Sequence, residues 1–360
     1  MLKDLKVRWW IFRGKRERTR NPAMAIKYFE KVLDAYPLCV VALTQIGSCL
    51  YDLQRYDEAV DTFGRALERS PNYAEVHAHL ALAYSRLGRN QEAYDSLQRA
   101  FRMKPKLSKH PYWVHLLGSV SGKIERWDDA LAAFRKLTEL DVSQADAWHG
   151  LGWAYSHLNR ELDAAAAYER AVGLAPGNSV ARFELGSVYF RLGEFQKAVV
   201  AIEEALHSEP DRAQCYCLLA SSYLRLGNQP EGLRAAERAL QLEPNSADTH
   251  FCLGCALHEP ETFERAAAEY EESLRLVPKQ FEALGNLGDA YLRLGRAEDA
   301  KKVLTQAERI NSSDPKLHHL LGEVYLKLSD RTAALRECEI LKQQDRSLAE
   351  ELEKLINVRI

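Results

Sequence analysis

Apolar residues recur along this chain with the three- and four-residue spacing of a buried helix face. Four apolar or small residues between 145 and 178 stand at i, i+3, i+4 and i+7, and therefore on one side of a single helix. They are Trp148, Leu151, Gly152 and Tyr155. A second apolar face runs from Ala164 to Val172 after a polar turn, and Pro176 ends it. The pattern predicts two helices joined by a turn.

The same pattern returns every 34 residues, which is typical of an array of helical repeats. The position of Gly152 is repeated as Gly47, Ala81, Gly118, Gly186, Ala220, Gly254, Gly288 and Gly322. The position of Ala164 is repeated as Ala25, Ala59, Ala93, Ala130, Ala198, Gly232, Ala266, Ala300 and Ala334. Small residues at both positions are predicted to lie where the two helices of a hairpin cross closely.

With this many registered copies, the chain resembles the tetratricopeptide repeat (TPR) family over almost its whole length. The resemblance implies an all-α fold, a right-handed superhelical solenoid of about ten helical hairpins. Residues 347–358 are predicted to form a C-terminal capping helix. The resemblance also implies that a partner binds in the concave groove lined by the first helix of each repeat.

The repeats divide the chain into five segments. They are a basic N-terminal segment with a degenerate first repeat (1–39), repeats two and three (40–105), an insertion with an atypical repeat (106–144), regular repeats (145–312), and the last repeat with the capping helix (313–360). The insertion at 106–111 breaks the period, so we expect it to be the most protease-sensitive internal point. Pro260 is expected to end the first helix of its repeat early.

Glycine occurs at a fixed point of the turn between the two helices of several hairpins. A left-handed residue at the end of a helix favours glycine, so we expect positive φ angles there. The positions are Gly88, Gly193, Gly227 and Gly295.

Charge and cysteine usage limit the classes of function. The formal net charge is −2, so the chain as a whole does not have the charge of a nucleic-acid-binding protein. The seven cysteines lie inside predicted helices without the spacing of a disulfide framework, which favours reduced thiols and a cytoplasmic protein. No apolar run approaches the roughly 20 residues that span a bilayer, and no secretory signal is predicted.

The first 20 residues are basic, with eight Lys or Arg against Asp4 and Glu17. One interpretation is a membrane-surface or nucleic-acid anchor, with Trp9, Trp10 and Phe12 as interfacial aromatics. The other is a degenerate first helix in which Trp9 and Phe12 cover the end of the array while the charges keep that end soluble. Deleting residues 1–20 would separate an adaptor that binds through its groove, which should keep its partner, from a factor that binds RNA or a membrane surface through the basic N-terminus.

No motif of catalysis is evident. No glycine-rich phosphate loop follows a strand, and no set of titratable groups converges, so the sequence predicts neither an enzyme nor a cofactor. The nearest set to a metal site is Cys217, Cys252, Cys255 and His258, which could hold zinc. Small buried cysteines beside the groove explain the same residues, and no metal site is predicted.

The predicted groove contains an apolar run through its middle. We call this run the apolar band: Trp153, Phe183, Phe190, Leu224, Phe251 and Leu292. The full predicted peptide-binding set adds His149, His157, Arg191 and Arg225. The alternative for Phe190 and Leu224 is that they mainly pack against the first helix of the next repeat. Family members that grip the C-terminal carboxylate of chaperones place lysine and asparagine at positions that here hold other residues, such as Cys217 and Ser221. A chaperone terminus is therefore not the predicted ligand.

These observations predict a non-enzymatic scaffold or adaptor that holds a peptide or a helix of a partner protein in its concave groove. The alternative is an RNA- or membrane-surface-associated factor that works through the basic N-terminus.

Overall fold

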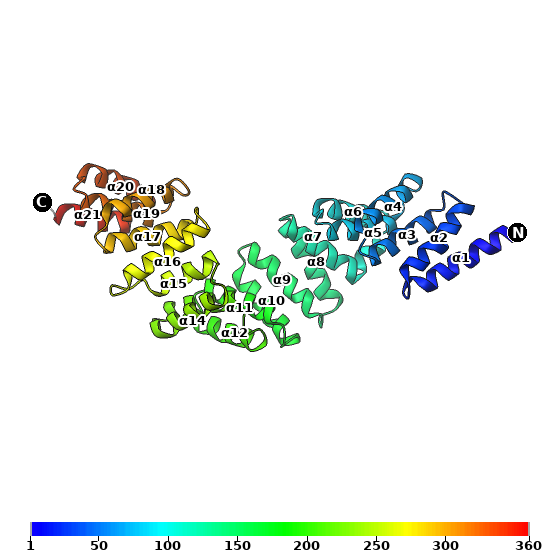
Figure 1. The fold of residues 1–360 in the computed structure, drawn as a ribbon, viewed down its shortest axis with the longest axis horizontal. Helices are drawn as coiled ribbons and strands as arrows, with labels where there is room; N and C mark the ends of the chain where they lie inside the picture. The colour runs from blue at the N-terminus through cyan, green and yellow to red at the C-terminus, as the bar shows by residue number, and fades with distance from the viewer. Residues whose placement is uncertain (1, 359–360) are drawn as a thin grey trace. The chain divides into compact units, whose positions relative to one another are not determined.

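The computed structural model describes residues 2–358, with side chains from Leu5 to Asn357. Met1, Arg359 and Ile360, at the outer ends of the predicted first and last segments, lie outside the described residues, as do the side chains of Lys3 and Asp4. The described residues form 21 α-helices and one short 3-10 helix, with no β-strand (Figure 1). The predicted all-α fold of about ten hairpins is thereby confirmed. The chain divides into two compact units, residues 1–176 and 177–360, and each is described by itself.

The N-terminal unit consists of five helical hairpins. Its elements are α1 (Leu2–Arg18), α2 (Pro22–Ala35), α3 (Val40–Asp52), α4 (Tyr56–Arg69), α5 (Ala74–Arg86), α6 (Asn90–Met103), η1 (Pro105–Lys109), α7 (Pro111–Lys123), α8 (Trp127–Leu140), α9 (Ala145–His157) and α10 (Glu161–Leu174). Each odd-numbered helix packs against the even-numbered helix that follows it, and from α3 onward it also packs against the hairpin before it.

The C-terminal unit consists of five more hairpins and a final single helix. Its elements are α11 (Ser179–Arg191), α12 (Phe195–Ser208), α13 (Ala213–Arg225), α14 (Gln229–Leu242), α15 (Ala247–Ala256), α16 (Phe263–Leu276), α17 (Phe281–Arg293), α18 (Ala297–Glu308), α19 (Pro315–Lys327), α20 (Arg331–Gln344) and α21 (Arg346–Val358). The last helix buries Leu352 and Ile356 against α19 and α20 and is the predicted cap.

The repeated glycine of the first helix makes room for a large side chain of the second. A Cβ added at Gly152 would lie 2.8 Å from the ring of Tyr168, and one at Gly254 would lie 2.6 Å from the ring of Tyr270. Both tyrosines are fully buried, so neither ring has space to withdraw. The small residue predicted from the sequence is therefore required by a ring sixteen residues later as well as by the close approach of two helices.

The turns between hairpin helices confirm the prediction for glycine. The four predicted glycines have φ between 74° and 77°. Non-glycine residues occupy the equivalent turn in four other hairpins, with φ between 56° and 63°. They are Gln54, Glu125, Asn159 and Ser329. These residues adopt a backbone conformation that costs an L side chain energy.

Two irregularities of the sequence are visible in the helices. The insertion after Pro105 folds as η1, and both of its lysines are exposed. Helix α15 has 10 residues, whereas α13 and α17 have 13 each, so the first helix of that repeat ends early as Pro260 predicts.

Different side chains of α1 pack against the array from those that the capping interpretation named. Trp9 and Phe12 are 51% and 62% exposed, and the Trp9 ring meets the Tyr28 ring of α2 edge-on at 5.9 Å. The side chains of α1 that pack against the rest of the hairpin are Val7, Trp10 and Ile11 instead. The helical period places apolar residues on two opposite faces of α1, and one of these faces remains largely exposed.

Candidate functional site

A cavity of about 460 Å³ opens on the first helices of three successive repeats in the C-terminal unit. Helices α13 and α15 supply most of its wall, and Gln280 and Glu282 at the start of α17 close one side. Apolar and thiol side chains form the wall between the helices. They are Cys217, Leu218, Phe251, Cys252 and Cys255.

Helical spacing explains why these side chains meet. Cys217 and Ser221 stand at i and i+4 on α13, and Phe251 and Cys255 stand at i and i+4 on α15, so each pair lies on one face of its helix. The 34-residue period places the two faces at the same height in neighbouring repeats. The Ser221 hydroxyl donates to the Cys217 carbonyl at 3.0 Å and is therefore satisfied within its own helix.

Two thiols at the cavity, those of Cys252 and Cys255, are held in their protonated form. An interaction with Cys217, together with burial, raises the pKa of Cys252 well above its usual value. Burial also raises the pKa of Cys255, although the Asn286 amide donates to its Sγ at 3.5 Å. Since the thiolate is the nucleophile and the metal ligand, these cysteines line the cavity as weakly polar, unreactive groups.

The four candidate metal ligands do not converge. The Cys252 Sγ lies 3.8 Å from the Cys217 carbonyl oxygen, so these two residues are neighbours. His258 is directed elsewhere, with its Nε2 2.9 Å from Asp289 Oδ2 and its Nδ1 3.3 Å from the Tyr270 hydroxyl. Burial would raise the pKa of Asp289, but His258 and Arg293 hold it below its usual value. Among the described side chains, no three His, Cys, Asp or Glu gather in a metal-binding group.

Three carboxylates stand at the cavity, and no basic side chain lines it in the described part of the chain. They are Glu243, Asp248 and Glu282, all of them exposed. None of the three forms an ion pair with a described side chain. The cavity therefore combines an apolar and thiol wall with uncompensated negative charge.

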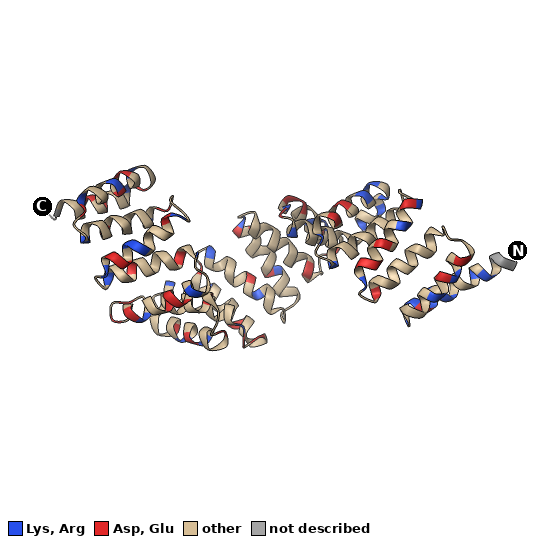
Figure 2. Cartoon of the chain, turned by 45° about the horizontal axis from the view of Figure 1, so that its top comes forward, with Lys and Arg blue, Asp and Glu red and all other residues tan. Residues whose placement is uncertain are grey.

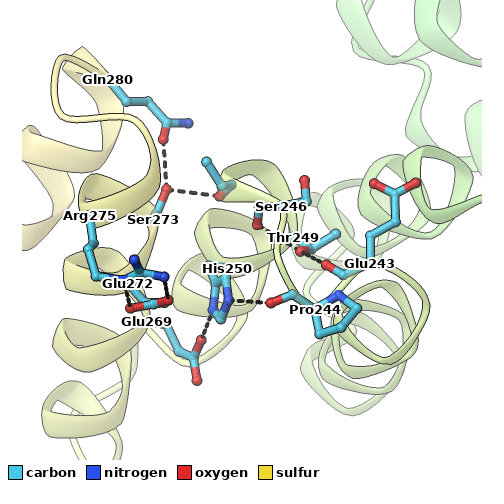
Figure 3. A network of polar contacts seen from close by, with 11 residues as sticks. Glu243, Pro244, Ser246, Thr249, His250, Glu269, Glu272, Ser273, Arg275 and Gln280 are labelled. Carbon is cyan, nitrogen blue, oxygen red and sulfur yellow. Dashed lines mark hydrogen bonds and ion pairs between the residues drawn. The ribbon is translucent and has the colours of Figure 1, made fainter.

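A network of polar contacts fixes the helices around the cavity (Figure 3). The Thr249 hydroxyl donates to the carbonyls of Glu243 and Ser246, at 2.7 and 2.9 Å, which ties α15 to the loop before it. The Ser273 hydroxyl lies 2.8 Å from the Ala247 carbonyl and 2.7 Å from the side-chain amide of Gln280. Buried hydrogen bonds of this kind hold the cavity wall in one geometry.

His250 completes this network on the other side of α15. Its Nδ1 lies 2.7 Å from Glu269 Oε2, and its Nε2 lies 3.0 Å from the Pro244 carbonyl. Equivalent residues of other repeats reach the same loop carbonyl. His77, Trp148, Tyr216 and His318 contact Pro71, Val142, Pro210 and Ser312 in this way.

Among the predicted band residues of the C-terminal unit, Phe251 lines the cavity. The Arg212 guanidinium lies 4.3 Å from the centre of the Phe183 ring and covers it. The Phe190 ring packs on Phe195 at 5.4 Å. These aromatics are partly buried, and none is among the strongly exposed apolar side chains of the described residues.

The aliphatic members of the band lie mainly in the repeat packing. Leu224 faces Gly232 of its own hairpin, where an added Cβ would lie 2.8 Å from Leu224 Cδ2. Leu292 is 3% exposed and belongs to the core of the C-terminal unit. Arg191 and Arg225 are exposed, and the Arg225 guanidinium lies 4.8 Å from the centre of the Phe195 ring.

The predicted residues of the N-terminal unit form a separate aromatic cluster. The Trp153 ring lies against Gly122, where an added Cβ would be 2.1 Å away. It meets the Trp127 ring edge-on at 4.9 Å, and the His157 ring stacks on Trp127 at 3.9 Å. His149 lies beside the Tyr168 ring at 5.6 Å. Much of the Trp153 surface is therefore used in packing between repeats.

The sequence did not identify the carboxylates of the cavity. Glu243 precedes α15, and Asp248 and Glu282 lie in the first turns of α15 and α17, where acidic residues are favoured in any helix. The one signal available was their recurrence in consecutive repeats beside Phe251. No helix in the described part of the chain is long and apolar enough to cross a membrane.

Models of the tetratricopeptide repeat match residues 38–106, 116–179, 217–280 and 257–324. A model of anaphase-promoting complex, cyclosome, subunit 3 matches residues 158–239. Outer dynein arm-docking complex subunit 4 of Xenopus laevis is 32% identical over 30% of this chain and 22% of its own length. Hsp70-Hsp90 organizing protein 1 of Glycine max is 27% identical over 25% of this chain and 15% of its own length. The chain thus covers less than a quarter of either relative.

Solved structures show the same fold. The APC/C hetero-tetramer Cut9-Hcn1 contains a chain that aligns with 94% of this one, over 87% of its own length, at 16% identity and a TM-score of 0.56. PilW, a type IV pilus biogenesis factor, aligns with 59% of this chain over 98% of its own length, at 21% identity and a TM-score of 0.53.

Proposed function

This chain belongs to the tetratricopeptide repeat family, and on that premise we propose that it is a non-enzymatic scaffold whose C-terminal unit holds a peptide segment of a partner protein. The cavity between α13, α15 and α17 carries the proposal. It lies on the first helices of the repeats, and it is large enough for one or two side chains of an extended peptide.

The chemistry of the wall defines the ligand. Phe251 and Leu218 offer apolar contact, and the protonated thiols add weakly polar surface without a charge. The carboxylates Glu243, Asp248 and Glu282 attract a cation. A peptide with a lysine or arginine beside an aliphatic or aromatic residue satisfies both features.

The same charges argue against a chaperone-type ligand. One protein similar to this chain is named Hsp70-Hsp90 organizing protein 1. A terminal carboxylate entering the present cavity would meet three carboxylates and no lining Lys or Arg among the described residues. Repulsion between the ligand carboxylate and these carboxylates disfavours binding, so we propose an internal or cationic peptide segment instead.

Protonated thiols also support a binding role over a catalytic one. A nucleophilic cysteine needs a lowered pKa or an adjacent base, whereas the contact with Cys217 and burial raise the pKa of Cys252, and burial raises the pKa of Cys255. Neither thiol is therefore activated as a nucleophile.

Selection from a random peptide library displayed on phage tests this proposal. The full chain is the bait, and the enriched peptides are then titrated in solution. We expect Lys or Arg next to apolar residues, and we expect Phe251→Ala to weaken binding about tenfold or more, as loss of a central aromatic anchor does. Leu162→Ala is the control, because Leu162 is exposed and lies outside the cavity. Enrichment of acidic peptides, or equal binding by Phe251→Ala, would reject the proposal.

A further inference from the structure

Helix α1 has a second apolar face that is largely exposed, where only the edge of the Trp9 ring meets another ring, that of Tyr28 in α2, at 5.9 Å. Val7, Trp10 and Ile11 pack toward α2 and α3. On the opposite side Leu5, Trp9 and Phe12 stand at i, i+4 and i+7, with 58%, 51% and 62% of their surfaces exposed. Three large apolar side chains on one helix face make a patch that a water-exposed helix does not normally carry.

Basic residues flank this patch on both sides and at its end. Helical spacing places Lys6 and Arg13 along one edge, Arg8 and Lys15 along the other, and Arg16 after Phe12 on the patch itself. Figure 2 shows that Lys and Arg recur along α1. Arg13 also places its guanidinium 5.6 Å from the centre of the Trp9 ring. Lys6, Arg8, Lys15 and Arg16 form no ion pair with any described side chain, so their charges are available to a partner.

Comparison with the other repeats shows what packs on the equivalent face of the later first helices. Gly14 meets the Phe29 ring as Gly47 meets the Phe63 ring, which aligns α1 with α3 and with every later first helix. The position of Phe12 corresponds to Gly150, whose added Cβ would lie 2.4 Å from Phe134 of the preceding hairpin. In the later repeats this face is therefore the one that packs on the hairpin before it.

The residues on α1 do not fit that packing. The position of Arg16 is 1% exposed or less in every later repeat and always holds a small or apolar residue. These residues are Cys49, Ala83, Val120, Ala154, Val188, Ser222, Ala256, Ala290 and Val324. Trp9 stands where α3 has the fully buried Ala42. Another hairpin packed in the same way would bury the Arg16 guanidinium without a partner, at a large desolvation cost.

We propose that this face of α1 binds the surface of an anionic membrane, with the helix lying in the plane of the interface. Leu5, Trp9 and Phe12 enter the boundary between headgroups and acyl chains, where tryptophan is favoured. The flanking Lys and Arg side chains reach the lipid phosphates, and each adds attraction to a negatively charged surface. The helix lies on the bilayer and does not span it.

The pattern favours a lipid surface over two other occupants. A nucleic acid would use the basic residues but leaves the exposed Leu5 and Phe12 unexplained. A second copy of α1 would cover the apolar residues but would bring two rows of Lys and Arg together, and like charges oppose that contact. A lipid interface satisfies the apolar and the basic residues at once.

Cosedimentation of the full chain with vesicles tests the proposal. One set of vesicles contains phosphatidylcholine alone, and the other contains phosphatidylcholine with phosphatidylserine. We expect binding to the anionic vesicles that falls as the salt concentration rises. The double variant Trp9→Ser/Phe12→Ser should bind at least about tenfold more weakly. Its matched control is Val142→Ser/Leu162→Ser, which removes two other exposed apolar side chains of the same unit and should bind like the wild type.

Two further measurements keep the test decisive. The variant Arg8→Gln/Lys15→Gln/Arg16→Gln changes only exposed side chains, so it should fold normally and still lose binding to the anionic vesicles. Equal binding to both kinds of vesicle, or full binding by either α1 variant, would overturn the proposal. So would tighter binding to RNA than to vesicles, or a concentration-dependent dimer that Trp9→Ser/Phe12→Ser abolishes.

Discussion

The same substitution, glycine to alanine, should stabilise one site of a hairpin and fail to stabilise another. Gly47 lies in α3 and Gly64 lies in α4. A Cβ at Gly64 meets no atom within 4 Å, whereas a Cβ at Gly47 would lie 2.6 Å from Cε1 of the fully buried Phe63 ring. Both changes gain the higher helix propensity of alanine, and only Gly47→Ala must displace a core ring.

The magnitudes follow from these two effects. Alanine in place of glycine inside a helix stabilises by about 1 kcal/mol, so Gly64→Ala should be stabilising by that amount. Overpacking a core typically costs about 1–3 kcal/mol, which cancels or exceeds the gain at Gly47. We therefore expect Gly47→Ala to lie about 1–3 kcal/mol below Gly64→Ala in free energy of unfolding.

The assay must report on this hairpin, because a repeat array need not unfold in one step. Hydrogen exchange of the α3 and α4 amides, followed by mass spectrometry, gives the local free energy of opening. Slower exchange in Gly64→Ala and unchanged or faster exchange in Gly47→Ala are the expected results. If both variants exchange more slowly to the same extent, the Phe63 ring is not confined as the structure indicates.

Three other predictions concern the turns, the pH dependence and the insertion. Glu125 has φ of 60° in a turn where other repeats have glycine, so Glu125→Gly should stabilise the N-terminal unit by about 1 kcal/mol and raise its melting temperature. An unchanged or lower melting temperature would show that the Glu125 backbone is not strained. Burial lowers the pKa of His318, but the Ser312 carbonyl and Glu337 outweigh it and leave the pKa above the ordinary 6.5. The charged form is thus favoured by folding, so the urea midpoint of the C-terminal unit should fall as the pH rises from 6.5 through the raised value; His318→Gln should lose this slope. Brief trypsin treatment should cut first after Lys106 or Lys109, which are exposed in η1, and early cleavage inside the regular repeats would count against a weak point there.

The period of the sequence was sufficient to predict the hairpins because each one is held by local spacing. Gly152 and its equivalents, the turn glycines and Pro260 all act within one repeat, so their effect can be derived from neighbouring residues. The same reasoning could not detect that Gln54 and Glu125 adopt the left-handed conformation, since nothing in their chemistry favours it. There the packing of the hairpin imposes the conformation on the residue.

The candidate site was harder to predict because it depends on contacts between repeats. Phe251 and Leu292 both belong to predicted first helices, yet one lines the cavity and the other is buried in the core. Helical spacing gives the direction of a side chain but not the neighbour that covers it. The exposed side chains Trp9 and Phe12 illustrate the same limit, because the apolar pattern of α1 is identical whether its outer face is covered or free.

The cavity is tested most directly by the charge on its carboxylates. One selected cationic peptide is titrated by fluorescence anisotropy against the wild type, Glu243→Gln/Glu282→Gln and the matched control Glu259→Gln/Glu261→Gln, which neutralises two exposed carboxylates outside the cavity. We expect the cavity variant to bind about fivefold or more weakly and to lose most of its salt dependence, while the control keeps the wild-type affinity. Equal affinity of the cavity variant and the control would contradict it and place the peptide elsewhere on the chain.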